Sequence, residues 1–316
     1  MEKRKIALVG DGKIAGDCMS VVMSHPCLTL SGYFFHKNND WSERNRQQIA
    51  APSYACTNIN ERDAVRALQS LSPDLIVNVN SFDILHETIL SIPRDGVINF
   101  HNGPLPQYRG VNIPTWAIYN GEKSHGVTWH LVDQQIDAGD ILAETRFPVE
   151  PDETAISLTF KCLAAGLELF KSLIADYAAT GILTGRPQVG DAKRYRYRDL
   201  PNDGYINFNW SRGDMSRFVR SFSFRPFSSP ELKSRFRVGR QTICAADLDM
   251  LDLSNPSVEP GTVLELDSRH IVIAALDSSV CAADLFMTNG EPVEPPALPV
   301  SAGSLLSQPA WDRGRN

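Results

Sequence analysis

The chain has 316 residues, of which 42% are hydrophobic, and its formal net charge of −6 corresponds to a sequence pI near 5.7. This length exceeds one typical domain and suits a larger domain with a smaller one, each able to bury a core. The acidic balance argues against a surface whose main partner is a phosphate backbone, so a small or protein-borne substrate is favoured and a nucleic-acid partner is not expected.

The six cysteines are scattered without any C-x-x-C pair. This is the pattern of reduced, packed thiols. The N-terminus runs directly into a short strand-like segment, and no apolar run approaches the roughly 18 residues of a membrane span. We therefore expect a cytoplasmic protein without a membrane segment.

In the first hundred residues, short runs rich in β-branched and aromatic side chains alternate with windows of helical periodicity. The strand-like runs are residues 6–9, 28–35, 75–79 and 97–100, and the helix-like windows include 63–71 and 85–92. This alternation predicts an α/β fold with a Rossmann-like, mostly parallel sheet and flanking helices.

A second pair of strand-like runs, 126–132 and 141–149, flanks the loop IDAGD at 136–140. A long helix is predicted from Asp152 or Thr154 to about Ala179, and Gly181 ends it. Residues 182–204 are rich in Gly, Pro, Arg and Tyr, which is typical of a linker.

Beyond residue 204, a short amphipathic helix is predicted around Met215, Phe218, Val219 and Phe222. Strand-like runs follow at 236–243, 262–266, 270–275 and 282–287. Short strands separated by turn residues predict a small β-barrel.

The first strand ends in GDGKIAG, where Gly10, Gly12 and Gly16 come near the spacing of a dinucleotide fingerprint. The third glycine lies one residue too far along the chain, and the next strand ends in Phe35, His36 and Lys37 where an acidic ribose ligand is required. The pattern therefore favours a tight strand-to-helix turn over a nicotinamide site.

The segment VINFHNGPLPQYRG at 97–110 begins as a buried strand and breaks at Gly103. The two-residue period of a strand places Asn99 and His101 on one face, at the carboxyl end where open α/β sheets usually build their sites. Asp137 lies in the second loop beside Gly139, where a tight turn can bring its carboxylate toward the imidazole. Taken singly, a histidine at a strand end and an aspartate in such a turn more often have structural roles, and only their combination with the surrounding sequence favours catalysis.

INFHNGPLPQYRG followed by IDAGDIL resembles the paired signature of the 10-formyltetrahydrofolate-dependent formyltransferases. INFNWSRGDMSRFVRSFSFRPF at 206–227 is similar to the start of that family's C-terminal OB-like domain. The resemblance implies a formyltransferase catalytic domain at 1–181, a linker at 182–204 and an OB-like domain at 205–316.

The resemblance also places Asn99, His101 and Asp137 at the family's catalytic positions. Asn99 would stabilise the developing oxyanion, and His101 would act as general base or as imidazolium. Asp137 would orient and support His101. No metal or covalent nucleophile is required.

For the co-substrate 10-formyltetrahydrofolate, the resemblance implies contacts from residues in two loops. These are Phe82, Asp83, Ile84, Leu85 and Gln135. On the acceptor side, the candidates are Tyr108, Asn112 and Trp116, together with His125 and His130 of HGVTWH. Packing in the sheet is the alternative role for these aromatic side chains.

The segment HGVTWH at 125–130 resembles stand-alone amino-sugar formyltransferases and formylating domains of peptide synthetases more than it resembles methionyl-tRNA formyltransferase. The stretch FFHKNNDWSERN lacks the basic, glycine-containing insertion of the tRNA-formylating members. We therefore expect an N-formyltransferase of specialised metabolism whose acceptor is an amino acid, a carrier-bound aminoacyl group or an amino sugar.

Three alternatives stay open. A methionyl-tRNA formyltransferase would bind phosphates, for which Arg194, Arg196 and Arg198 are candidates, although a solvated linker is the simpler role for them. A formyltetrahydrofolate hydrolase would use the same three side chains with water as the acceptor. A nicotinamide-dependent oxidoreductase would use GDGKIAG.

Overall fold

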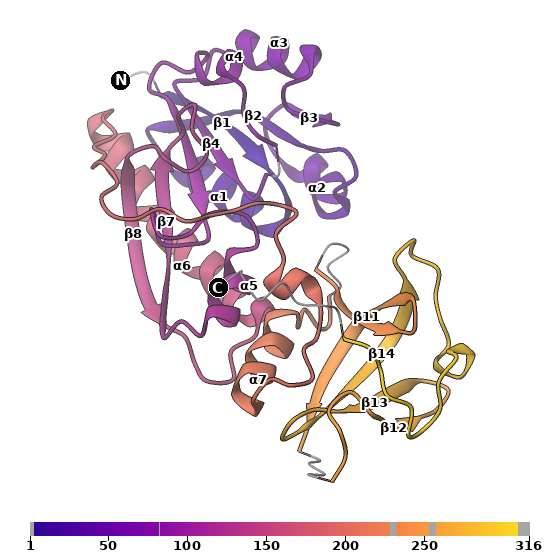
Figure 1. Ribbon diagram of the computed structural model, residues 1–316. Helices are drawn as coiled ribbons and strands as arrows, with labels where there is room; N and C mark the ends of the chain where they lie inside the picture. The colour runs from indigo at the N-terminus through magenta and orange to yellow at the C-terminus, as the bar shows by residue number, and fades with distance from the viewer. Residues whose placement is uncertain (1–2, 82, 228–231, 253–256, 309–316) are drawn as a thin grey trace. The chain divides into compact units, whose positions relative to one another are not determined.

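The computed structural model describes residues 3–81, 83–227, 232–252 and 257–308 (Figure 1). The chain divides into two compact units. Unit 1 comprises Met1–Ile113, Ser124–Pro148 and Thr159–Tyr195, and unit 2 comprises Pro114–Lys123, Val149–Leu158 and Arg196–Asn316. The domain boundaries at 181 and 204 stay a prediction.

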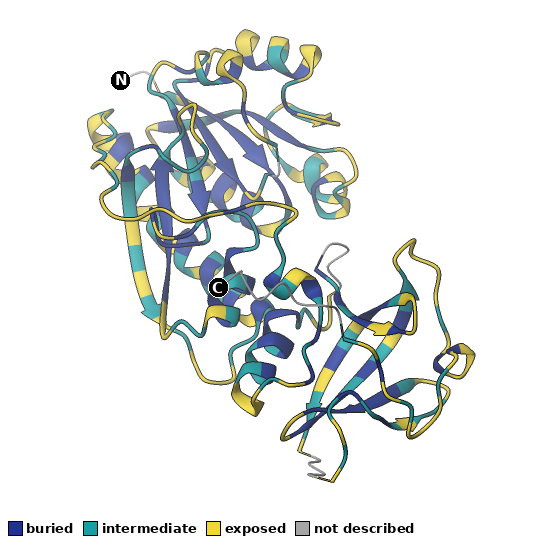
Figure 2. Cartoon of the chain, in the orientation of Figure 1, coloured by how far each residue is buried: buried dark blue, intermediate teal, exposed yellow. Residues whose placement is uncertain are grey.

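Unit 1 is built on a seven-stranded sheet with the order β3-β2-β1-β4-β5-β7-β8. The strands are β1 Arg4–Gly10, β2 Leu28–His36, β3 Ser53–Cys56, β4 Leu75–Val79, β5 Val97–His101, β7 Ser124–Leu131 and β8 Ile141–Pro148. The first five in the sheet order are parallel, while β7 runs antiparallel to β5 and β8 antiparallel to β7. This confirms the predicted α/β fold with a mostly parallel sheet, whose central strands are buried while edge strand β8 alternates (Figure 2).

Helices flank this sheet, as predicted (Figure 1). The helices of unit 1 are α1 Gly12–Ser24, α2 Asp40–Asn45, η1 Arg46–Gln48, α3 Arg62–Leu71, α4 Glu87–Leu90 and most of α6 Ala155–Thr180. Helix α5 Ile113–Asn120 lies almost wholly in unit 2, which also contains the first residues of α6. None of the helices in the described part of the chain has the length and apolar character that a bilayer crossing needs.

The long helix α6 covers the face of the sheet opposite to the predicted site. The Trp129 indole donates to the Gly166 carbonyl of α6 at 2.9 Å, and the Phe100 ring lies 5.4 Å from that of Trp129. A Cβ on Gly166 would overlap the Phe100 ring, so this glycine lets the helix approach the strands. Since side chains alternate along a strand, Asn99 and His101 face away from α6.

The helix predicted at 85–92 is shorter in the structure, where α4 spans only Glu87–Leu90. The Asn60 side chain explains the late start, because it donates to the Ile84 carbonyl and accepts from the His86 amide. Those two bonds hold the backbone extended where a helix would need the same groups.

The GDGKIAG turn is explained by close packing. Gly10 has φ +152°, and a Cβ there would overlap the Val79 carbonyl of the neighbouring strand β4. Gly16 lies under the Trp41 ring, which a Cβ would displace. The Asp11 carboxylate accepts from the His36 amide at 3.1 Å, so it ties the β1 and β2 ends together. These contacts agree with the structural interpretation of the motif.

Unit 2 contains a five-stranded antiparallel sheet with the order β10-β11-β14-β13-β12, preceded by α7 Arg212–Ser221. Its strands are β10 Ser234–Val238, β11 Gln241–Leu251, β12 Val263–Leu266, β13 His270–Ala274 and β14 Ser279–Met287. The run predicted at 236–243 is in fact two strands, because Gly239, at φ +58°, turns the chain between them. Two short helical turns, η2 Pro201–Gly204 and η3 Pro295–Ala297, lie outside the sheet.

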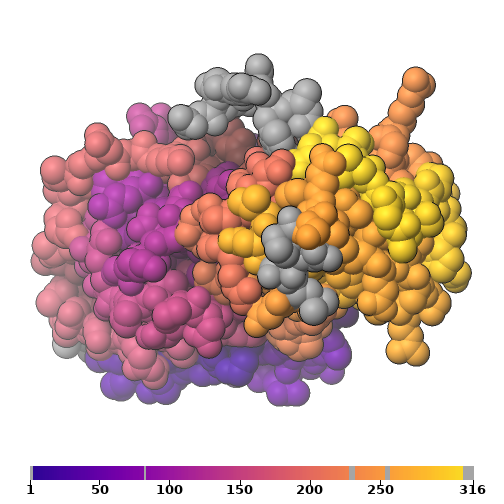
Figure 3. All heavy atoms as spheres, turned by 60° about the horizontal axis from the view of Figure 1, so that its bottom comes forward, coloured from indigo at the N-terminus to yellow at the C-terminus, as the bar shows by residue number. Residues whose placement is uncertain are grey.

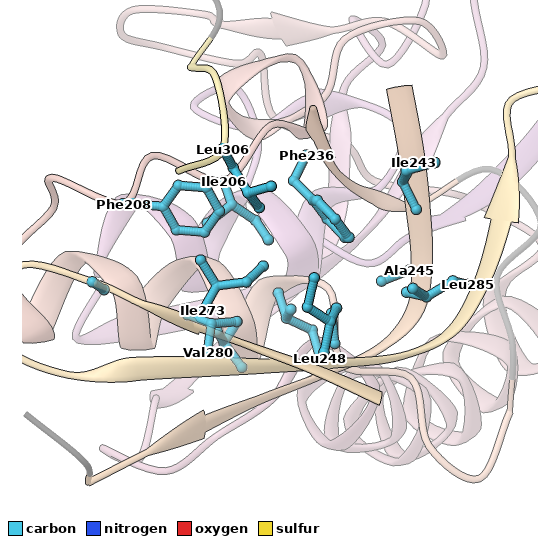
Figure 4. Close-up of a cluster of buried hydrophobic side chains, with 14 of the residues drawn as sticks. Ile206, Phe208, Phe236, Ile243, Ala245, Leu248, Ile273, Val280, Leu285 and Leu306 are labelled. Carbon is cyan, nitrogen blue, oxygen red and sulfur yellow. The ribbon is translucent and has the colours of Figure 1, made fainter. Parts of the chain in front are cut away.

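The unit 2 core forms on one face of this sheet. Figure 4 shows Phe208, Phe236 and Leu306 pointing into the same cluster as Ile273 and Leu248 of the strands. The orange and yellow atoms in the space-filling view are the surface of this unit (Figure 3). Within the described residues, the edge strands β10 and β12 do not pair with each other. An antiparallel sheet is therefore shown, and its closure into an OB-like barrel stays a prediction.

All six cysteines are free thiols, as their spacing predicted. Burial raises the pKa of Cys56 to about 12, which suppresses the reactive thiolate.

Candidate active site

Strand β5 presents Asn99 in the middle of a row of polar side chains. The Asn99 Oδ1 accepts from Asn78 Nδ2 at 2.7 Å, and Asn99 Nδ2 lies 3.0 Å from His130 Nε2. Asn78 and His130 are its direct neighbours on β4 and β7. The amide is therefore held from both sides, while Asn99 itself stays half-buried.

His101 is nearly enclosed, with 5% of its side chain exposed. Its Nε2 lies 2.6 Å from the Tyr108 carbonyl oxygen. Because a carbonyl only accepts, Nε2 must carry the hydrogen, which leaves Nδ1 as the lone-pair nitrogen of the neutral ring. Burial lowers the pKa of His101 and the Asp137 charge opposes this shift only in part, so the resting ring is neutral.

The Asp137 carboxylate faces both histidines. Its Oδ2 lies 3.7 Å from His101 Nδ1 and its Oδ1 lies 3.6 Å from His130 Nε2, and Oδ2 also accepts from the Gly110 amide at 2.7 Å. Burial alone would raise the pKa of Asp137, but the positive charge that His101 or His130 gains on protonation and the Gly110 N–H lower it well below its usual range. The group is therefore a carboxylate, placed to stabilise a proton on His101 Nδ1.

The loop that carries Asp137 is fixed by backbone geometry and by one glutamine. Asp137 has a positive φ of 52°, and a Cβ on the neighbouring Gly139 would overlap the Leu131 carbonyl. Gln188 Nε2 donates to the carbonyls of both Asp137 and Gly139 at 2.8 Å. Gln188 falls in the segment predicted as a linker, so part of that segment buttresses the site.

The three residues predicted to be catalytic thus meet in one network, with His130 joining Asn99 to Asp137. The sequence had offered His130 only as an acceptor-side candidate, and it did not point to Asn78, Gln188 or the Tyr108 carbonyl. Period-two alternation places Thr128 and His130 on one face of β7, but only the register shows that His130 opposes Asn99.

The predicted folate contacts are spread over different environments. Phe82 lies outside the described residues. The Asp83 carboxylate accepts from Asn58 Nδ2 and from the Ile59 amide, Ile84 is 64% exposed and Leu85 is buried in the core of unit 1. Gln135 is exposed in the loop before Asp137. Contact with folate stays a prediction for all of them, and among the described candidates Ile84 is the most exposed apolar side chain.

The predicted acceptor contacts also differ in environment. The Tyr108 ring is buried and stacks on Tyr195 at 5.4 Å, so Tyr195 is packed in unit 1 and is not part of a solvated linker. Asn112 has φ +57°, and its buried Nδ2 has no partner among the described residues. Trp116 belongs to unit 2, where its ring meets that of Tyr119 edge to face.

His125 is a buried structural histidine whose Nε2 lies 3.0 Å from the Asn102 carbonyl. Burial lowers its pKa from 6.5 to about 4. As the pH falls below 6.5, this histidine becomes protonated in the unfolded chain, whereas in the folded protein it stays neutral down to about pH 4. The free energy of unfolding therefore decreases as the pH falls from 6.5 to about 4. The loss from this group amounts to about 3 kcal/mol between pH 7 and pH 4.

Urea unfolding at several pH values measures this effect. In His125→Gln, which keeps a donor for the Asn102 carbonyl but does not titrate here, the free energy of unfolding should depend on pH less steeply by that amount. Equal pH slopes in the variant and the parent protein would contradict the assignment.

One group in unit 2 has ligand types suited to a cation. The carboxylates of Glu265 and Asp267 and the His270 imidazole offer ligand atoms within 4.8 Å of one another. Asp267 Oδ1 already accepts from the amides of Arg269 and His270. These hydrogen bonds give Asp267 a structural role in the turn between β12 and β13, so the cluster does not require a cation to explain it.

Comparison with known proteins finds a family model that covers this site. The family model described as formyl transferase matches residues 33–174, which include all three predicted catalytic residues. Residues 33–174 are therefore similar to a formyl transferase domain. The predicted resemblance is thereby confirmed.

Two curated relatives match about half of the chain. GDP-perosamine N-formyltransferase of Brucella melitensis is 33% identical over 164 residues, which are 52% of this chain and 62% of the relative. Methionyl-tRNA formyltransferase of Thermodesulfovibrio yellowstonii is 34% identical over 173 residues, which are 55% of this chain and 56% of the relative. The chain thus spans about 60% of the length of these relatives.

A solved structure matches over a longer range. WlaRD, a sugar 3N-formyl transferase determined with dTDP and 5-N-formyl-THF, superimposes with a TM-score of 0.63 at 18% identity, and the match covers 90% of this chain and 98% of WlaRD. At this identity the likeness shows the fold, which the region similar to a formyl transferase domain and the residues after it share with WlaRD.

Proposed function

We propose that this chain is an N-formyltransferase of specialised metabolism that moves a formyl group from 10-formyltetrahydrofolate to the amine of a nucleotide-linked amino sugar. The observation that carries the proposal is the network of Asn99, His101 and Asp137 inside the region that is similar to a formyl transferase domain. The amino-sugar acceptor is supported by the relative that acts on GDP-perosamine and by the fold of WlaRD.

The donor set of the site fits a formylated folate. An amide nitrogen carries two hydrogens, and among the described residues only His130 uses one from Asn99. His101 offers an unprotonated Nδ1, and Asn78 Oδ1 is buried without a partner in the described part of the chain. Bound here, the folate would supply an electrophilic formyl carbon and a nitrogen leaving group.

The side chains then divide the work of transfer. Asn99 donates its second N–H to the formyl oxygen as negative charge develops there. His101 Nδ1 takes the proton from the attacking amine, and the Asp137 carboxylate stabilises the resulting imidazolium. The same nitrogen returns the proton to the departing amine, so His101 ends neutral and no proton is left over.

The segment after β2 favours a small acceptor over tRNA. Its arginines are engaged locally, since Arg44 lies 3.9 Å from Asp40 and Arg46 lies 3.0 Å from Glu43. With a formal net charge of −6, the chain also repels polyanions at long range. Both features oppose binding of the negatively charged acceptor stem of a tRNA.

A mass-spectrometric product screen tests the proposal. The protein is incubated with 10-formyltetrahydrofolate and one acceptor at a time: dTDP-linked and GDP-linked amino sugars, free amino acids, a carrier-bound aminoacyl thioester and methionyl-tRNA. We expect the gain of one carbonyl unit on an amino sugar nucleotide, formed about a hundredfold or more slowly by His101→Ala.

Other outcomes of the screen select the alternatives. Formylation of methionyl-tRNA alone would make the chain a tRNA enzyme. Formate released at the same rate with and without every amine would make it a hydrolase. Binding of NADH without binding of a folate analogue in isothermal titration would exclude the whole proposal.

A further inference from the structure

The row Asn78, Asn99 and His130 crosses three adjacent strands, β4, β5 and β7, at a single level of the sheet. Asn78 is 6% exposed and His130 is 2% exposed. The polar atoms are joined in sequence, from Asn78 Nδ2 to Asn99 Oδ1 at 2.7 Å and from Asn99 Nδ2 to His130 Nε2 at 3.0 Å. The row continues to the backbone, since His130 Nδ1 lies 2.7 Å from the Leu131 carbonyl oxygen.

For a neutral His130 ring, the backbone end sets the direction of every hydrogen bond in the row. The Leu131 carbonyl only accepts, so the hydrogen sits on His130 Nδ1. In the neutral ring Nε2 is then an acceptor, and only the Nδ2 end of Asn99 can satisfy it. Asn99 Oδ1 is left for Asn78, which must present its own Nδ2.

This direction decides which end of the Asn99 amide serves the reaction. The two ends of an amide have the same shape, so packing alone does not distinguish Nδ2 from Oδ1. With the nitrogen held at His130, the second Asn99 N–H is free to meet a formyl oxygen. The reversed amide would present an oxygen there, which would repel the developing charge.

We infer that His130 is a positioning residue for formyl transfer, which acts by fixing the orientation of the Asn99 amide through its Nε2 acceptor. The inference rests on the proposed function for its effect on the rate. The hydrogen-bond direction itself is a property of the protein without any ligand.

The first test reads the ring directly and needs no activity. Two-bond proton–nitrogen correlation spectra of the 15N-labelled protein should show His130 with a hydrogen on Nδ1 and none on Nε2. The signals are assigned by their loss in His130→Gln and His130→Asn. A hydrogen on Nε2, or an imidazolium, would overturn the inference whether or not the chain transfers formyl groups.

The second test uses a matched pair of substitutions. A glutamine at 130 can place its amide oxygen near the position of Nε2, whereas an asparagine mimics only Nδ1 and its bond to Leu131. We expect His130→Asn to lower kcat by about tenfold, the rate equivalent of one net hydrogen bond, with KM for folate and acceptor within about twofold. His130→Gln should recover most of that rate.

A double-mutant cycle then asks whether His130 acts through Asn99. In an Asn99→Ala background, His130→Asn should cause no further loss of kcat, because the amide that it orients is gone. Equal losses in the Gln and Asn variants, or an undiminished loss in the Asn99→Ala background, would overturn the inference. Absence of any N-formyl product with the unmodified protein would instead refute the proposed function.

Discussion

His101→Ala is expected to lower kcat by about a hundredfold or more, because it removes the base to which we assign the proton of the attacking amine. The affinity for folate should change little, since the ring is held by the Tyr108 carbonyl and nearly enclosed. Steady-state rates of N-formyl product and equilibrium binding of 5-formyltetrahydrofolate measure the two quantities separately.

The role of His101 as a base also predicts how kcat depends on pH. Burial lowers the pKa of His101 below the ordinary value of 6.5. The ring acts as a base only when it is unprotonated, so kcat should stay constant above pH 6.5 and fall at lower pH as the pH passes through the lowered pKa. We call this decrease of kcat at low pH the acid limb. His101→Ala should lack the acid limb as well as most of kcat.

A histidine outside the network provides the control. His25 lies at the end of α1, where its ring accepts from the Cys27 amide. His25→Ala should keep the rate and the acid limb of the parent protein. Near-normal turnover in His101→Ala, or an acid limb that persists in it, would remove the base assigned here.

Asn99 is expected to show an effect of similar size for a different reason. Removing one donor to a developing oxyanion typically costs about a hundredfold to a thousandfold in kcat, so Asn99→Ala should fall in this range. Asn99→Asp should be at least as severe, although a carboxylate has nearly the shape of the amide. Its oxygens cannot donate to the formyl oxygen, and its charge opposes the charge that develops there.

The pair of variants separates a chemical role from a packing role. If Asn99 only filled space between Asn78 and His130, the aspartate variant would keep most of the rate and the alanine variant would lose stability instead. Thermal unfolding measured beside kcat makes this distinction. A fast Asn99→Asp enzyme would contradict the oxyanion assignment.

Sequence patterns predicted most of the strands and helices of unit 1, because these patterns depend on local properties of the chain. Alternation of β-rich runs with helical windows predicted the strand Leu75–Val79 at its observed bounds and the long helix Ala155–Thr180 to within a few residues. The period of two likewise placed Asn99 and His101 on one face. These features depend on residues that are neighbours along the chain.

The parts that were not predicted depend on register and on backbone direction. His130 opposes Asn99 only because β7 returns antiparallel in one particular register. The Tyr108 carbonyl contacts His101 because the chain turns back after Gly103. Every residue has a backbone carbonyl, so the sequence does not indicate which one bonds to the ring. In unit 2, the single strand predicted at 236–243 ignored Gly239, whose positive φ makes the turn.

A crystal structure with 5-formyltetrahydrofolate and an amino sugar nucleotide tests the central claim most directly. We predict the formyl group beside β5, with its oxygen within about 3 Å of Asn99 Nδ2 and the acceptor amine within hydrogen-bonding reach of His101 Nδ1. A formyl group bound away from these two atoms, with the amine directed elsewhere, would contradict the account.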